Sequence, residues 1–101
     1  MNTGLTIEWT AEAQNKLNVV FDYLENHWTS HEVKKFAKRL DEALSFIIKF
    51  PFIYPASTQN NMVRRCVLTR QISLYYKVNP TKILIITLFD NRQNPASLKV
   101  I

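Results

Sequence analysis

The sequence predicts an α+β domain, in the order β-α-α-β-β-β, in which a helical hairpin packs on a mainly antiparallel four-stranded sheet. Three observations support this prediction: apolar residues recur at helical spacing up to residue 50, the period becomes that of strands after residue 61, and the later strands are joined by short turns. The 101 residues, 47% of them hydrophobic, suit one core, and we expect a single domain over residues 1–101.

A first strand is predicted close to the N-terminus. Leu5, Ile7 and Trp9 alternate with Thr6 and Glu8, which is the period of a strand that buries one face. Its place in the sheet does not follow from this pattern.

Two amphipathic helices are predicted next. Thr10 is a good N-cap for a helix from about Ala11 to Asn26, and Thr29 begins a second helix that ends near Phe50, because the following Pro51 has no amide hydrogen. The buried stripes are predicted to be Ala13, Leu17, Val20, Phe21, Leu24 and Trp28 in the first helix, and Val33, Phe36, Ala37, Leu40, Leu44, Ile47 and Ile48 in the second. The short connection makes the helices antiparallel neighbours.

Three further strands are predicted at Met62–Leu68, Gln71–Val78 and Lys82–Asp90, where branched and aromatic residues are frequent. Their short turns permit only antiparallel pairing. The unbroken apolar run Ile83–Ile86 indicates that the last strand lies inside the sheet. The tail over residues 91–101 could be a further strand or a short turn of helix.

The middle strand of these three alternates between two faces. Four of its residues, Ile72, Leu74, Tyr76 and Val78, are expected to pack against the helices. The remaining residues Ser73, Tyr75 and Lys77 are then expected to form a solvent face, which would be concave and positively charged.

Composition limits the classes of function. The net charge of +5 and the pI near 9.6 indicate an anionic partner, either nucleic acid or an acidic protein segment. Gly4 is the only glycine, which argues against phosphate-cradling loops and therefore against a nucleotide cofactor; we expect no cofactor. The apolar run Ile83–Phe89 is too short to span a bilayer and the start of the chain lacks a leader pattern, so a cytoplasmic protein without membrane contact is expected.

Catalytic and metal-binding side chains are few. Cys66 has no second thiol and lies in a strand pattern, so it is interpreted as a buried apolar residue. His27 and His31 fall at the helix junction, where capping or surface roles are expected, and they lack the partners of a metal site. No metal site is predicted.

The arginines are the candidate binding residues. Arg64 and Arg65 point to opposite faces of their strand, Arg70 lies in the hairpin turn and Arg92 follows the last strand. Guanidinium groups near Tyr75 suit contacts with phosphates and bases, so these four arginines are predicted to bind the target or nucleic acid. The alternative is that they form an ordinary solvated surface.

The order of elements resembles that of the RelE/ParE toxin family. The resemblance covers nearly the whole chain and rests on short segments in the expected order. These are Phe50-Pro51, Val63-Arg64-Arg65, Ile72-Ser73-Leu74-Tyr75-Tyr76-Lys77-Val78 and Phe89-Asp90-Asn91-Arg92-Gln93-Asn94-Pro95. It implies the growth-inhibiting toxin of a bacterial type II toxin-antitoxin system, associated in this family with plasmid stabilisation. It also implies neutralisation by an acidic antitoxin segment that covers hydrophobic grooves and the charged face.

Members of that family act in two ways. Some are ribosome-dependent mRNA interferases, and ParE-like members inhibit DNA gyrase. The resemblance places two interferase residues on Arg65 and Arg92, but it places Ser73, Val67 and Leu98 where an arginine, a lysine and a tyrosine are expected.

These differences favour a ParE-like toxin that binds and inhibits an essential target, plausibly gyrase, because loss of acid, base or charge-stabilising groups slows cleavage by orders of magnitude. One alternative is a metal-independent interferase whose catalytic residues are Arg65 and Arg92 with Tyr75 or Lys77. Another is a non-toxic module that only binds an antitoxin.

Overall fold

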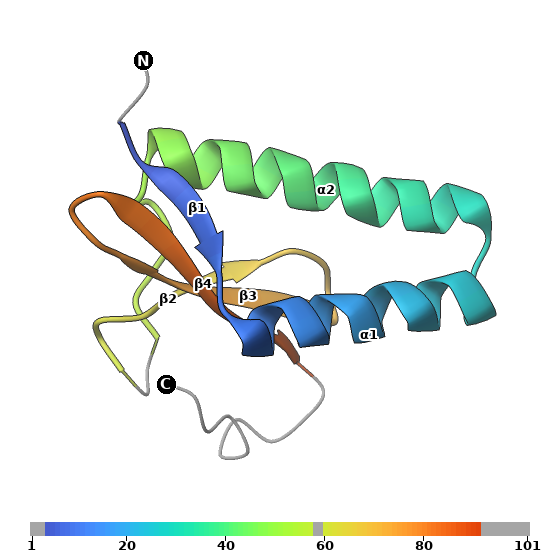
Figure 1. The fold of residues 1–101 in the computed structure, drawn as a ribbon. Coiled ribbons are helices and arrows are strands. Elements are labelled where there is room, and N and C mark those ends of the chain that lie inside the picture. The colour runs from blue at the N-terminus through green and yellow to red at the C-terminus, as the bar shows by residue number, and fades with distance from the viewer. Residues whose placement is uncertain (1–3, 58–59, 92–101) are drawn as a thin grey trace.

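The computed structural model describes residues 4–57 and 60–91. Its elements are β1 (Thr6–Trp9), α1 (Ala11–His27), α2 (Ser30–Lys49), β2 (Arg64–Val67), β3 (Ile72–Val78) and β4 (Lys82–Asp90). This is the predicted α+β order, and the two helices form the predicted hairpin (Figure 1). The predicted tail over residues 91–101 lies almost wholly outside the described residues.

The sheet has the strand order β1-β4-β3-β2. β2, β3 and β4 pair antiparallel, as their short turns predict, and β1 pairs parallel with β4 in the register Ile7 to Ile83. β4 therefore lies inside the sheet, as the run Ile83–Ile86 predicts. A parallel neighbour is possible because the helical hairpin supplies the long crossover between β1 and the later strands.

Both helices begin at the predicted caps. The Thr10 side chain accepts a hydrogen bond of 3.0 Å from the Ala13 amide, and the Thr29 hydroxyl accepts one of 3.3 Å from the Glu32 amide. Each satisfies an amide that the first helical turn leaves without an intrahelical partner. α1 ends at His27, so Trp28 is the residue after the helix and not the last of its buried stripe.

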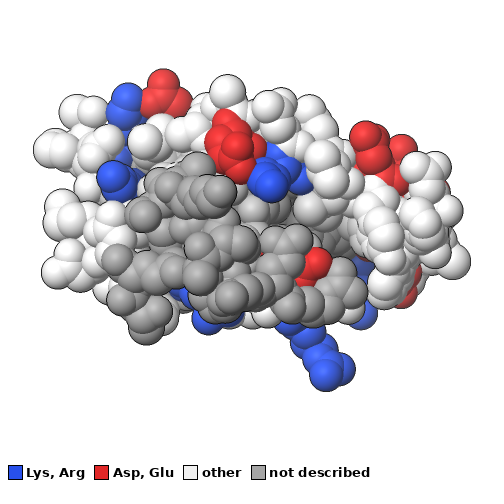
Figure 2. Space-filling view, turned by 90° about the horizontal axis from the view of Figure 1, so that it is seen from below, with Lys and Arg blue, Asp and Glu red and all other residues white. Residues whose placement is uncertain are grey.

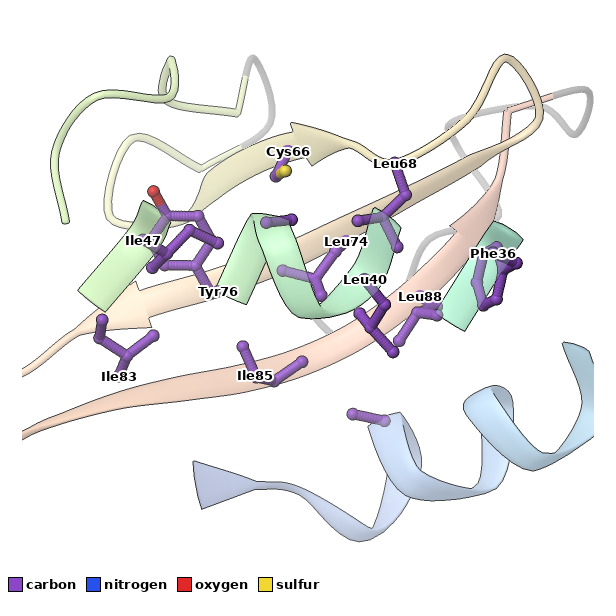
Figure 3. Close-up of a cluster of buried hydrophobic side chains, with 12 residues drawn as sticks. Phe36, Leu40, Ile47, Cys66, Leu68, Leu74, Tyr76, Ile83, Ile85 and Leu88 are labelled. Carbon is purple, nitrogen blue, oxygen red and sulfur yellow. The ribbon is translucent and has the colours of Figure 1, made fainter. Parts of the chain in front are cut away.

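The main core lies between the helices and one face of the sheet. Figure 3 shows Phe36, Leu40 and Ile47 of α2 opposite side chains from the strands, among them Tyr76. Cys66 is fully buried in this cluster, which confirms its interpretation as an apolar core residue. The helices meet through Phe21 and Phe36, whose rings lie edge to face at 5.4 Å.

A β-bulge interrupts the pairing of β3 with β4. Tyr75 pairs with Thr87 while the next residue, Tyr76, pairs with Ile85, so Ile86 is an extra residue in β4. Such a bulge bends the strand and redirects one side chain. Here it directs Ile86 into a second cluster, whose effect on the sheet face is described below.

Candidate functional site

The sheet face turned away from the main core was predicted to be open to solvent, and this prediction is wrong for Ser73 and Tyr75. Ser73 is fully buried, and Tyr75 is 6% exposed within a second cluster formed with Val63 and Ile86. Phe89 packs on that cluster and meets the Tyr75 ring edge to face at 6.5 Å. The bulge contributes to this burial because it adds the Ile86 side chain to the face.

Ser73, Asn91 and Arg65 form a hydrogen-bonded cluster on this same face, which we call the Asn91 cluster. The Ser73 hydroxyl donates to Asn91 Oδ1 at 2.7 Å, and Arg65 Nη2 donates to the same oxygen at 3.2 Å. Asn91 Nδ2 in turn donates to the Arg70 carbonyl at 3.4 Å. One amide side chain therefore joins β2, β3 and the β2–β3 turn.

Arg65 has a hydrogen-bond donor that the described residues of the Asn91 cluster do not use. Its Nε is buried, and no hydrogen-bond acceptor for it lies within residues 4–57 and 60–91. Tyr75 is its cross-strand partner, so the structure brings together two of the predicted site residues. A half-buried guanidinium beside an aromatic ring is suited to binding an anionic group.

Arg64 lies on the opposite face, as its alternation with Arg65 predicts. Its Nη1 donates to the Tyr54 carbonyl at 2.6 Å and to the Phe52 carbonyl at 3.2 Å, and its guanidinium lies 4.9 Å from the centre of the Phe52 ring. The side chain holds the turn after α2 in place. Arg64 is thus separated from Arg65 and engaged within the protein.

The other predicted site residues are more dispersed. Arg70 is exposed in the β2–β3 turn, and Lys77 is half-buried near the far end of β3. Arg92 lies outside the described residues. Of the predicted set, the described part of the chain unites Arg65 with Tyr75 and places Arg70 at the margin of the Asn91 cluster.

Sequence reasoning missed an open groove between the two helices and the end of the sheet. Its volume is about 600 Å³, and its apolar wall includes exposed Val19, Tyr23 and Trp28 together with buried Phe36 and Leu88. Val19 and Tyr23 are apolar residues four positions apart that lie outside the predicted buried stripe of α1. That spacing is the sequence signal that could have revealed the groove.

Charged residues of both signs line this groove. Lys16, Lys35 and Arg39 contribute positive charge, and Glu32 and Asp90 contribute negative charge. Arg39 also binds the backbone of the neighbouring strand region. Its Nε donates to the Leu68 carbonyl and its Nη2 to the Val67 carbonyl, both at 3.0 Å.

The side chains of the core are not set up for nucleophilic chemistry. Burial raises the pKa of the Cys66 thiol, and since the thiolate is the reactive form, a neutral buried thiol is a poor nucleophile. Burial also raises the pKa of Tyr54 and raises that of Tyr76 to about 12. The Tyr76 hydroxyl donates to the Pro51 carbonyl at 2.8 Å.

The surface seen in Figure 2 carries basic and acidic side chains in small separate groups, so the described part of that face presents no continuous basic patch. Within residues 4–57 and 60–91, no group of three or more His, Cys, Asp or Glu side chains is placed to hold a metal ion. None of the helices described is both long and apolar enough to cross a membrane.

Comparison with known proteins gives a consistent result. The family model described as the ParE toxin of the type II toxin-antitoxin system parDE matches residues 7–95. No curated protein matches the sequence.

Solved structures show the same fold at low identity. The chromosomal ParDE toxin-antitoxin system from P. aeruginosa includes a chain 17% identical, with a TM-score of 0.71 over 87% of this chain and 97% of that one. The YoeB/ParE toxin from Agrobacterium tumefaciens is 10% identical, with a TM-score of 0.63 over 86% and 99%. A chain of the E. coli DinJ-YafQ toxin-antitoxin complex is 12% identical, with a TM-score of 0.61 over 88% and 94%.

Proposed function

The chain belongs to the ParE toxin family of type II toxin-antitoxin systems, and we propose that it is a cytoplasmic toxin that binds and inhibits an essential target, plausibly DNA gyrase, until a cognate antitoxin neutralises it. Inhibition by binding requires a stable surface and no acid or base. Cleavage of RNA requires both an acid and a base, positioned beside the reacting phosphate.

One observation carries the choice of a binder over a nuclease. Ser73, which stands where the resemblance places an interferase arginine, is fully buried and hydrogen-bonded to Asn91. A buried serine in this position supplies no positive charge to a developing phosphorane. Tyr75, a possible replacement for the missing acid or base, is 6% exposed and packs against Phe89.

The antitoxin is proposed to bind in the groove between the helices. Its apolar wall would bury the nonpolar side chains of a bound segment, and Lys16 and Lys35 would pair with acidic ones. The net charge of +5 also favours an acidic partner. The E. coli structure of similar fold contains a toxin-antitoxin complex, which supports an antitoxin as the partner.

The second candidate is an mRNA interferase with an altered site. The observation that favours it is the Nε of Arg65, which has no acceptor within the described residues and could bind a phosphate oxygen. In that case Arg65 and Arg92 would hold the phosphate and Tyr75 or Lys77 would transfer the proton.

Expression of the chain without its antitoxin separates these functions. The proposal expects growth arrest with DNA-damage signalling, inhibition of gyrase supercoiling by the purified chain, and intact mRNA. Codon-phased mRNA cuts on ribosomes that disappear in Arg65→Ala would establish the interferase. Normal growth, with retained antitoxin binding, would leave a non-toxic binding module.

A further observation tests the antitoxin directly. A short acidic protein encoded next to this chain should bind it and restore growth when the two are expressed together. If the neighbouring reading frames encode no such protein, the proposed neutralisation is wrong.

A further inference from the structure

The groove between the helices contains a carboxylate that an acidic partner does not explain. Glu32, in the first turn of α2, is half-buried and lines the groove together with the apolar side chains of Tyr23 and Phe36. An acidic antitoxin segment brings further carboxylates into this groove, and like charges at such a contact repel each other. Glu32 therefore opposes the proposed partner unless that partner places a basic residue against it.

The structural role of Glu32 leaves its charge free to act on a partner. An acidic residue in the first turn of a helix is favoured by the helix dipole. The cap itself comes from Thr29, which accepts a hydrogen bond from the backbone amide of Glu32 and not from its side chain. The Glu32 carboxylate forms no ion pair within residues 4–57 and 60–91. A bound segment can therefore pair with it.

The register of the two antiparallel helices places Glu32 and Lys16 at opposite ends of the groove. The rings of Phe21 and Phe36 meet at 5.4 Å, which sets α1 and α2 level at these residues. Glu32 comes four residues before Phe36, toward the connection between the helices, and Lys16 comes five residues before Phe21, toward the sheet (Figure 1). At about 1.5 Å per residue, Glu32 and Lys16 are roughly 13 Å apart along the groove.

Positive charge predominates along the rest of the groove. Lys35 lies one turn after Glu32, and Lys16 and Arg39 lie closer to the sheet, where Asp90 is the acidic residue among the described residues that line the groove. Lys35 forms no ion pair within the described part of the chain. The groove therefore has a negative end and a positive end, with an apolar wall between them.

We propose that Glu32 is a specificity-determining residue of this groove. It selects an antitoxin segment with a basic side chain at one end, apolar side chains in the centre and an acidic side chain at the other end, where it pairs with Lys16. The separation of roughly 13 Å corresponds to about nine residues of helix or about four of extended chain. A segment that is acidic throughout binds more weakly, and the charge order fixes the direction of the segment. This inference rests on the proposed binding of an antitoxin in the groove.

Charge reversal at Glu32 tests the pairing in a calorimetric titration with the acidic protein encoded next to this chain. Glu32→Lys should weaken binding by at least about tenfold, because it sets two positive groups against each other. Attraction between the net charges alone predicts tighter binding, since this change makes the chain more positive. Glu25→Lys is the matched control: Glu25 is exposed and outside the groove, so the same charge change should not weaken binding.

Rescue in the partner distinguishes a lost ion pair from a damaged fold. The basic residues of the antitoxin are replaced by glutamate one at a time, and one of these antitoxin variants should restore binding to the Glu32→Lys chain. Replacement of one acidic residue of the same segment by lysine should likewise restore binding to the Lys16→Glu chain. Circular dichroism and urea denaturation check that each variant of the chain is folded.

The outcomes separate this inference from the proposed function. If Val19→Asp weakens binding and Glu32→Lys does not, the antitoxin occupies the groove but Glu32 does not select it. If neither change weakens binding, the antitoxin binds elsewhere and both proposals fail. Selection by Glu32 is also overturned if no basic-to-acidic replacement in the antitoxin restores binding to the Glu32→Lys chain.

Discussion

The hydroxyl of Thr10 donates a hydrogen bond of 2.7 Å to the carbonyl of Ile86, 76 residues further along the chain. The hydroxyl oxygen of Thr10 also accepts a hydrogen bond from the Ala13 amide and so caps α1. Ile86 is the extra residue of the bulge in β4. Its side chain helps to bury the face of the sheet that is turned away from the main core. One threonine therefore connects the start of the first helix to the irregularity that shapes the candidate site.

Thr10→Val should lower the free energy of unfolding by about 2–3 kcal/mol, because it removes a helix cap and leaves a carbonyl without its donor. Thr29→Val is the control, since Thr29 caps α2 at an exposed position, and it should cost only about 1 kcal/mol. Urea denaturation measures both. Equal losses would mean that the bond to Ile86 contributes nothing.

Arg39→Ala should lower the free energy of unfolding by about 1–3 kcal/mol and speed amide exchange in the β2–β3 turn, because two carbonyls lose a charged donor. Arg39→Lys should recover only part of this, since an ammonium group lacks the planar geometry that reaches both carbonyls. Lys38→Ala, at an exposed neighbouring position, is the control. Unchanged exchange in Arg39→Ala would contradict the assignment.

The chain should lose stability above pH 10. An unfolded tyrosine deprotonates near pH 10, whereas burial raises the pKa of Tyr76 to about 12 in the folded protein. Between these values the unfolded state binds fewer protons, so the free energy of unfolding falls by roughly 1 kcal/mol per pH unit.

The raised pKa values of Tyr54 and Cys66 act in the same direction, so Tyr76→Phe should reduce this slope without abolishing it. Met62→Leu alters an exposed side chain that cannot ionise and should leave the slope unchanged. Denaturation series at several alkaline pH values would show the difference. An identical slope in Tyr76→Phe would contradict the assignment.

Ser73→Arg should not create an interferase. Ser73 is fully buried against Asn91, so an arginine at this position would have to displace its neighbours and bury its charge, and it should destabilise the fold by more than about 3 kcal/mol. Ser73→Ala should cost about 1 kcal/mol and leave growth inhibition intact. A folded Ser73→Arg chain that cleaves mRNA would refute the proposed binding mode.

Val19→Asp should weaken antitoxin binding by at least about tenfold, because it places a carboxylate in the apolar wall of the groove where an acidic segment is proposed to bind. Val67→Asp is the control, since Val67 is exposed but lies outside the groove. Calorimetric titration with the antitoxin measures both. Equal weakening would place the antitoxin elsewhere.

Much of the fold could be predicted because burial is periodic in regular elements. The stripes of both helices and the inner face of β3 follow from spacing alone, and Thr10 and Thr29 mark the helix starts. The candidate site was harder to predict. The burial of Ser73 depends on Asn91, 18 residues away, and the groove depends on exposed apolar residues outside the expected stripes.

The sequence by itself determined the order of the elements, the inner core and the family resemblance, since these depend on local spacing and short segments. Only the tertiary structure decided that β1 joins β4 in parallel and that a bulge at Ile86 helps to close the outer face. It also decided that Arg39 and Arg64 bind backbone carbonyls, while the Nε of Arg65 has no acceptor among the residues that the structure describes. These features arise between residues distant in sequence. Such contacts depend on the distances and angles at which the elements pack, and the spacing of apolar residues along the chain does not encode these.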